Sequence, residues 1–342
     1  MNRTLIGICL LLTASVCTAQ KNEIYKKSIA SLQVVAGDDW LSPPITQLDG
    51  EPITIAFDDL THEYHRYTYT IEHCEADWST TTQLVASDYL DGFAEGNTID
   101  DVQKSINTKT LYTHYQLQIP NERCRLKMSG NYRLTVFDEN NDNEKILSAC
   151  FMVVEPLAGI QMEVVTNTDI DINGTHQQVN MEVNYGMLQV TDPATQIKTI
   201  VLQNGRWNKE RFNIKPQYVM PDALKWVHNK QLIFNGGNEY RKFEMLDVNH
   251  TTMGLESVNW DGNDYHAYVW TDEPRPNYVY DEDANGAFYI RNSDNVENNT
   301  SSDYLIVHFK LQAPRQNGDV YLNATWTNDQ LTPEYKMHYN EQ

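Results

Sequence analysis

The chain has 342 residues and carries 26 Lys and Arg against 47 Asp and Glu, a net charge of −21. Such an acidic surface repels phosphate backbones and anionic lipid, which argues against nucleic-acid binding and against direct membrane insertion. Charged or amide side chains interrupt every apolar stretch after the first twenty residues within about ten positions, too few for a membrane-spanning helix.

The N-terminus has the pattern of a cleaved export signal. Arg3 precedes the apolar run Leu5 to Val16, and Cys17-Thr18-Ala19 places small residues where a signal peptidase cuts. We therefore expect residues 1–19 to be a signal peptide and Gln20 to begin the mature chain. Loss of Arg3 leaves 25 basic and 47 acidic residues, a net charge of −22.

Two of the five cysteines leave with this signal. The mature chain keeps Cys74, Cys124 and Cys150, an odd number, so at most one disulfide forms within it. Two alternatives are equally consistent with the sequence. Either one disulfide forms, or all three cysteines are small, half-buried hydrophobic side chains. Trp78 follows Cys74 too closely for the Cys, Trp, Cys spacing of an immunoglobulin domain.

Hydrophobic alternation with period two dominates the first half of the mature chain. It predicts strands at 67–74, 111–119, 132–136 and 147–153. The last two segments flank the polar cluster Asp138 to Asn143, which predicts a hairpin turn. One short helix is expected within Leu84 to Asp91.

The same alternation resumes after a linker at residues 155–159. It recurs at 181–185, 200–202, 232–234, 265–269 and 304–309. A strand with one apolar face needs a second sheet to cover it. We therefore predict an all-β chain of two tandem antiparallel β-sandwich domains, residues 20–155 and 160–342.

Few residues have the spacing of a catalytic or metal-binding motif. His62-Glu63-Tyr64-His65 is one residue short of a zinc-protease motif, and in an extended segment its histidines point to opposite faces. The sequence contains no nucleophile elbow, phosphate-binding loop or dinucleotide fingerprint. We therefore predict no catalytic residues and no cofactor.

The one metal candidate is an acidic loop, residues 281–286. Asp281, Asp283 and Asn285 supply oxygen ligands at alternate positions before Gly286, as a calcium loop requires. Asn292 stands where a bidentate Glu belongs, and the flanks resemble strands. An acidic β-turn without metal is the favoured interpretation.

Five tryptophans fall in the second half of the chain: Trp207, Trp226, Trp260, Trp270 and Trp326. A coplanar exposed pair would favour sugar binding, whereas a buried set would be core.

Motifs in order along the chain resemble one known family. They are Phe57-Asp58-Asp59-Leu60, Tyr67 to Trp78, Asp88 to Phe93, Ser105 to Thr108, His114-Tyr115, Ile119-Pro120, Ser129 to Tyr132, Phe151 to Glu155, Phe234 to Arg241, Asp303-Tyr304 and Gly318 to Leu322. Together they are similar to the type 9 secretion system plug proteins, over nearly the whole mature chain. Members continue past the equivalent of Met337 to Tyr339, so we expect missing final strands and an unpaired edge at Tyr335 to Tyr339.

The resemblance implies a non-enzymatic periplasmic protein of Bacteroidota type, peripheral to the outer membrane. Its expected role is to close the periplasmic opening of the outer-membrane translocon barrel, and that barrel is its expected partner. The motifs do not give the contact residues. A carbohydrate-binding or adhesive β-sandwich is the alternative, and a hydrolase ranks last because no catalytic constellation is present.

The export signal gives the first prediction. Mass spectrometry of envelope fractions should find the mature N-terminus at Gln20 without lipid, because Val16 occupies the position before Cys17 where lipoprotein processing prefers a small residue. Recovery of lipidated Cys17 would contradict it.

Overall fold

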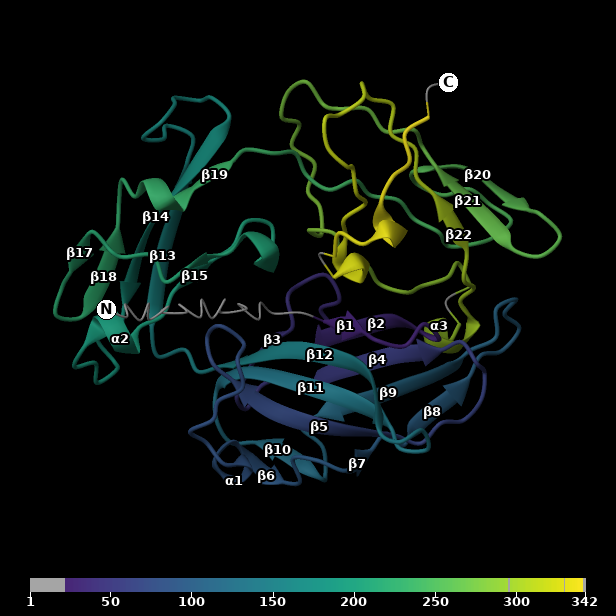
Figure 1. The fold of residues 1–342 in the computed structure, drawn as a ribbon, viewed down its shortest axis with the longest axis horizontal. Helices are drawn as coiled ribbons and strands as arrows, with labels where there is room; N and C mark the ends of the chain where they lie inside the picture. Colours follow the sequence, from purple (N-terminus) through teal and green to yellow (C-terminus); the bar gives the residue numbers. More distant parts are fainter. Residues whose placement is uncertain (1–21, 295, 329, 341–342) are drawn as a thin grey trace, which may run out of the picture.

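A computed structural model of the chain describes residues 22–294, 296–328 and 330–340. Its strands fall into three groups along the chain (Figure 1). Residues 22–154 form the first sandwich, at the bottom of Figure 1. Residues 159–235 form the middle unit, at the upper left, and residues 238–340 form the last unit, at the upper right.

The first sandwich consists of two sheets. One has the order β1-β12-β11-β5-β7, with β3 parallel to β12, and contains β1 (Glu23–Ile24), β3 (Ile45–Gln47), β5 (Tyr67–Cys74), β7 (Asn97–Thr98), β11 (Gly130–Asp138) and β12 (Glu144–Val154). The other has the order β2-β4-β9-β8 and contains β2 (Ile29–Ala36), β4 (Ile53–Asp59), β8 (Asp101–Lys104) and β9 (Thr113–Ile119).

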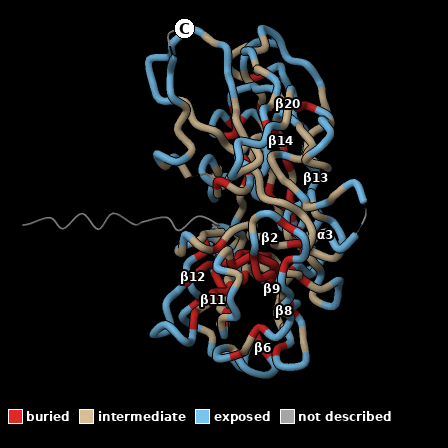
Figure 2. Tube along the Cα trace, turned by 90° about the vertical axis from the view of Figure 1, so that its right-hand side faces the viewer, coloured by how far each residue is buried: buried red, intermediate tan, exposed pale blue. Residues whose placement is uncertain are grey.

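The core of the first sandwich lies between these sheets, where alternate residues of the facing strands are buried (Figure 2). Tyr67 on β5 meets Tyr115 on β9 edge to face, with ring centroids 4.8 Å apart. Tyr115 in turn stacks on Phe57 of β4 at 5.3 Å. These aromatic contacts join the two sheets because each ring projects from the apolar face of its strand.

The predicted hairpin is confirmed as β11 and β12. Val136 pairs with Leu147, and the polar turn lies between the strands. Asp142 and Asn143 adopt φ of 50° and 54°, a left-handed conformation that short polar side chains tolerate.

The predicted short helix is also present, as α1 (Ala86–Tyr89). It leads into β6 (Leu90–Gly92), which pairs with β10 (Cys124–Leu126) in a two-stranded ribbon. Gly92 has φ of 110°, and a Cβ there would lie 2.0 Å from the Arg123 carbonyl oxygen. Only glycine permits this close approach.

The middle unit is built on one five-stranded sheet. Its order is β13-β14-β18-β17, with β19 pairing another part of β14, and it contains β13 (Gly159–Val165), β14 (His176–Asn184), β17 (Tyr218–Val219), β18 (Ala223–Trp226) and β19 (Ile233–Asn235). The connections contain α2 (Pro193–Gln196), β15 (Ile200–Val201), η1 (Trp207–Lys209), β16 (Arg211–Phe212) and η2 (Lys230–Leu232). A core cluster around Met181, Trp226 and Phe234 belongs to this unit alone.

The last unit has less regular structure. It contains β20 (Leu255–Trp260), β21 (Tyr265–Val269), β22 (Ile306–His308), α3 (Asn298–Ser301), η3 (Thr325–Thr327) and η4 (Pro333–Tyr335). β20 and β21 are antiparallel, and β22 runs parallel to β21. The expectation of an unpaired segment at Tyr335 to Tyr339 is wrong at its start, because Leu322 N–H donates to the Tyr335 carbonyl at 2.9 Å and Met337 N–H donates to the Val320 carbonyl at 2.8 Å.

The prediction of an all-β, mainly antiparallel fold is confirmed. The first sandwich ends at Val154 and β13 begins at Gly159, so residues 155–158 of the predicted linker lie between the strands and its last residue begins β13. The domain limits stay a prediction, and the strands of 160–342 lie in two groups of sheets. The predicted signal peptide lies outside the described residues. No helix of the described segments combines the length and apolar character needed to cross a membrane.

The core of the first sandwich gives a stability prediction. Leu134→Ala removes a fully buried side chain from β11 and should lower the free energy of unfolding by about 2 to 5 kcal/mol, because a cavity remains. Leu41→Ala, at an exposed position, should change it by less than about 0.5 kcal/mol. Urea unfolding measures both, and equal midpoints would contradict the assigned core.

Candidate functional site

Two adjacent carboxylates at the end of β4 are the centre of the candidate site. Asp58 and Asp59 are buried, with exposed fractions of 3% and 0%. Successive strand residues point to opposite faces of the sheet, so Asp59 points into the sandwich and Asp58 points out of it. On the neighbouring strand β9, His114 pairs with Asp58 in register and Thr113 pairs with Asp59.

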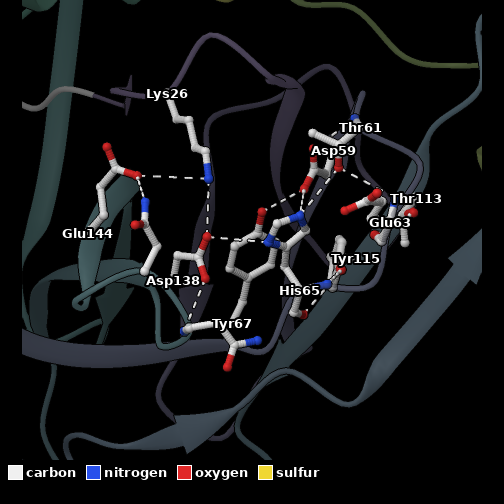
Figure 3. A network of polar contacts seen from close by, with 12 residues as sticks. Lys26, Asp59, Thr61, Glu63, His65, Tyr67, Thr113, Tyr115, Asp138 and Glu144 are labelled. Carbon is white, nitrogen blue, oxygen red and sulfur yellow. Dashed lines mark hydrogen bonds and ion pairs between the residues drawn. The ribbon is translucent and has the colours of Figure 1, made fainter.

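The inner carboxylate belongs to the network of Figure 3. Tyr67 donates its hydroxyl hydrogen to Asp59 Oδ2 at 2.7 Å. The His65 ring lies between two buried carboxylates, with Nε2 3.6 Å from Asp59 Oδ2 and Nδ1 3.3 Å from Asp138 Oδ2. Lys26 Nζ lies 3.1 Å from the same Asp138 oxygen. Asp59 and Asp138 are thus compensated by nearby donors and cations, as burial of a carboxylate requires.

The tyrosines of this network are donors with a fixed protonation state. Burial raises the pKa of Tyr67, and the hydrogen bond to the Asp59 carboxylate raises it further. Burial raises the pKa of Tyr115 to about 12. Its hydroxyl accepts the His65 backbone N–H at 2.7 Å and so fixes the loop that carries the imidazole.

The outer carboxylate contacts a residue distant in sequence. Tyr304, in the last unit, donates to Asp58 Oδ2 at 2.6 Å, and its hydroxyl lies 2.7 Å from Ser31 Oγ on β2. His114 Nδ1 lies 2.7 Å from Asp58 Oδ1. Burial raises the pKa of Tyr304, and the Asp58 charge and hydrogen bond add to the shift, so this hydroxyl stays protonated at neutral pH. We call Ser31, Asp58, His114 and Tyr304 the junction.

Further contacts hold the last unit on the same face of the first sandwich. The Tyr112 ring meets the Tyr304 ring edge to face at 5.5 Å, and its hydroxyl donates to the Ser302 carbonyl at 3.0 Å. Ile106 N–H donates to the carbonyl of Thr300, a residue of α3, at 2.7 Å. Backbone, aromatic and charged contacts together fix the orientation of the last unit.

The middle unit meets the first sandwich elsewhere. The Trp207 and Trp78 rings meet edge to face with centroids 5.6 Å apart. The Trp78 side chain packs in a small cluster with Cys74 and Cys150. The contact is mainly apolar, in contrast to the junction.

The junction suits docking better than chemistry. Asp58 and His114 are 3% and 5% exposed, so a substrate cannot reach them without displacement of the last unit. The Tyr304 hydroxyl bonds to both Asp58 and Ser31 across the contact. His114 Nε2 is buried without a hydrogen-bond partner among the described residues, which is a cost that a docking contact tolerates when its other bonds are good.

The candidate calcium ligands Asp281 and Asp283 form hydrogen bonds with different residues of the protein. Asp281 Oδ1 accepts from Lys242 Nζ at 2.7 Å, and this hydrogen bond and charge hold the pKa of Asp281 below its usual range. Asp283 accepts the Tyr240 backbone N–H and, at 3.0 Å, the Asn285 backbone N–H. The described residues contain no group of three metal-ligating acidic, His or Cys side chains. The loop therefore ties its turn to the segment at 240–242.

The five tryptophans of the second half do not form an exposed coplanar pair. Trp226 is buried, Trp207 packs on Trp78, and Trp326 packs on Phe288. Trp260 and Trp270 are exposed but lie at opposite ends of the β20–β21 hairpin. Five strand residues separate the two ends by roughly 17 Å.

The cysteines are all buried thiols. β11 lies between the strands that carry Cys74 and Cys150, since Asn131 pairs with Cys74 and Arg133 pairs with Cys150. Two strand spacings alone separate the strands of Cys74 and Cys150 by roughly 9.5 Å, and the offset of two residues adds to the Cα separation, which is beyond the reach of a disulfide. Of the two alternatives, the structure therefore has three unpaired, buried thiols.

The His62 to His65 segment forms the turn between β4 and β5. His62 adopts φ of 57°, while His65 joins the Asp59 network. The junction was not predicted from the sequence, although three of its residues, Asp58, His114 and Tyr304, lie in motifs that carry the family resemblance. The available signal was the occurrence of neighbouring polar and aromatic residues, Asp58-Asp59, His114-Tyr115 and Asp303-Tyr304, in segments whose alternation places them on two faces.

The fold and junction define an all-β protein of docked units around an N-terminal sandwich. Residues 29–155 match the family described as "Type 9 secretion system plug protein 1st domain". The chain belongs to the type 9 secretion system plug protein family.

A crystal structure of a hypothetical protein from Parabacteroides merdae extends the likeness to the rest of the chain. It is 39% identical, has a TM-score of 0.88, and is matched over 94% of this chain and 81% of its own. No curated protein matches the sequence. The family resemblance is thus confirmed over residues 29–155, and the common fold spans nearly the whole chain.

The junction gives a prediction for Tyr304→Phe. The change leaves the buried Asp58 carboxylate with one donor fewer and should destabilise the protein by about 1 to 3 kcal/mol. It should also speed proteolysis of the last unit while the first sandwich stays intact. Tyr278→Phe is the matched control, because it removes a hydroxyl that donates to Glu239 at an exposed position. Urea unfolding and limited proteolysis measure the difference, and equal effects of both variants would contradict the docking role.

Proposed function

We propose that this protein closes the periplasmic opening of the type 9 outer-membrane translocon barrel and acts by exclusion rather than catalysis. The observation that carries the proposal is the match of residues 29–155 to the plug family's first domain. The proposal places the mature protein in the periplasm, at the inner surface of the outer membrane.

The architecture supports this role. A plug has to keep its shape against a wide aqueous pore, and the junction joins the first sandwich to the last unit through buried hydrogen bonds. The net charge of −22 expected for the mature chain keeps such a body hydrated and separate from anionic lipid. The separation of Trp260 from Trp270 gives less support to the carbohydrate-binding alternative, which needs a shared aromatic platform.

The proposal predicts a stable complex without enzymatic turnover. The protein should co-purify with the translocon barrel from detergent-solubilised outer membranes, because sealing a pore requires contact around its perimeter and more than about 1,200 Å² of buried surface. Deletion of the gene should make the outer membrane leakier to bulky solutes. Failure to recover the barrel, together with specific retention on a glycan column, would replace this proposal with the carbohydrate-binding one.

A further inference from the structure

The middle unit has an open sheet edge at β13 (Figure 1). All but the last of the seven residues of β13 are exposed, and the strand pairs with β14 on one side only. In an antiparallel pair every second residue directs its N–H and C=O away from its neighbour. The free side of β13 therefore presents a row of backbone groups available to another strand.

One face of this edge is apolar. Ile160, Met162 and Val164 are 68%, 62% and 53% exposed. They pair in register with Val183, Met181 and Val179, which are buried in the core of the middle unit. Directly paired residues point to the same face, so the core face of the sheet continues onto β13 without cover.

The two edges of this sheet are protected differently. The opposite edge is formed by two short strands, β17 and β19. β17 has two residues and is flanked by Pro216 and Pro221, which cannot donate to an added strand, and β19 has three residues. β13 is longer, contains no proline, and pairs with β14 over seven consecutive positions without a bulge. Elsewhere, the β2–β4, β11–β12 and β20–β21 pairs all contain a register shift.

The polar face of β13 indicates the charge of its partner. Glu163 is the charged residue of the strand, and it has no ion-pair partner in the part of the chain that the structure describes. The nearby Glu182 is already paired with Lys225 at 3.0 Å. A second copy of this chain would bring another net charge of −21, which opposes association, whereas a basic segment is attracted.

We propose that the β13 edge binds an extended segment of a partner protein in which apolar residues alternate with Lys or Arg. The segment adds a strand to the sheet through backbone hydrogen bonds. Its apolar side chains extend the strip formed by Ile160, Met162 and Val164, and a basic side chain faces Glu163. This proposal depends on the proposed function at one point: the partner protein is a component of the secretion machinery.

The surface is tested first with the purified protein and a synthetic heptapeptide of alternating Val and Lys. Met162→Lys adds a charge to the edge, the device by which natural edge strands prevent pairing, and should weaken binding at least tenfold. Val219→Lys is the matched control, because it makes the same change in net charge at a 66% exposed position on the opposite edge, and it should leave affinity unchanged. Hydrogen exchange should show peptide-dependent protection of residues 159–165.

Three results would overturn the proposal. One is equal loss of affinity in the two Lys variants, and another is equal binding of a scrambled peptide, since both indicate general charge attraction. The third is protection of β13 that grows with protein concentration without peptide, accompanied by dimers in sedimentation, which assigns the edge to a second copy.

Co-purification separates this proposal from the proposed function. Recovery of the barrel with wild-type protein and Val219→Lys, but not with Met162→Lys, supports both. Recovery with all three overturns the assignment of β13 to that contact and leaves the plug function standing. Failure with wild-type protein contradicts the plug function, and the peptide experiment then decides the β13 edge by itself.

Discussion

The pair of carboxylates at Asp58 and Asp59 is the constraint on which the arrangement of the molecule depends. Two adjacent buried acids on one strand cannot share partners, because the alternation of the strand directs them to opposite sides of the sheet. Each therefore requires its own donors, since a buried carboxylate without them is costly. Asp59 has Tyr67 and His65 inside the sandwich, and Asp58 has His114 and Tyr304 outside it.

Because Asp59 faces inward and Asp58 faces outward, β4 takes part both in the core of the first sandwich and in its contact with the last unit. Tyr67 and Tyr115 are core residues that also hold the polar network, so the loop that carries His65 is fixed by the same rings that join the sheets. Tyr304 reaches the outer face across a separation of 246 residues and forms one hydrogen bond to β4 and a contact to β2. The last unit has little regular sheet of its own, so its position depends strongly on the first sandwich.

The middle unit contrasts with that arrangement. It has its own core cluster, and the ring contact between Trp78 and Trp207 joins it to the first sandwich. Its sheet is protected by short length and flanking prolines at β17 but is open at β13. A family associated with type 9 secretion has to contact other proteins, and a unit with an open strand edge offers them backbone hydrogen bonds as well as apolar surface.

The sequence alone predicted several of the strands and which of their residues share a face, but not β2, β4 or β20. Alternation at 67–74 and 132–136 predicted β5 and β11, because a half-buried strand requires an apolar residue at every second position. The polar cluster at 138–143 predicted the turn between β11 and β12 for a similarly local reason. The ordered motifs also identified the plug family, which the match over residues 29–155 confirmed.

Only the tertiary structure decided which faces meet. Nothing local in Asp58 or Tyr304 specifies a partner 246 residues away, because that contact depends on the docking of whole units. The disulfide question likewise depended on strand order, since β11 separates Cys74 from Cys150. The sequence could not predict the exposure of Ile160, Met162 and Val164 for the same reason. Their alternation is that of an ordinary half-buried strand, and only the position of β13 at the sheet edge leaves that face uncovered.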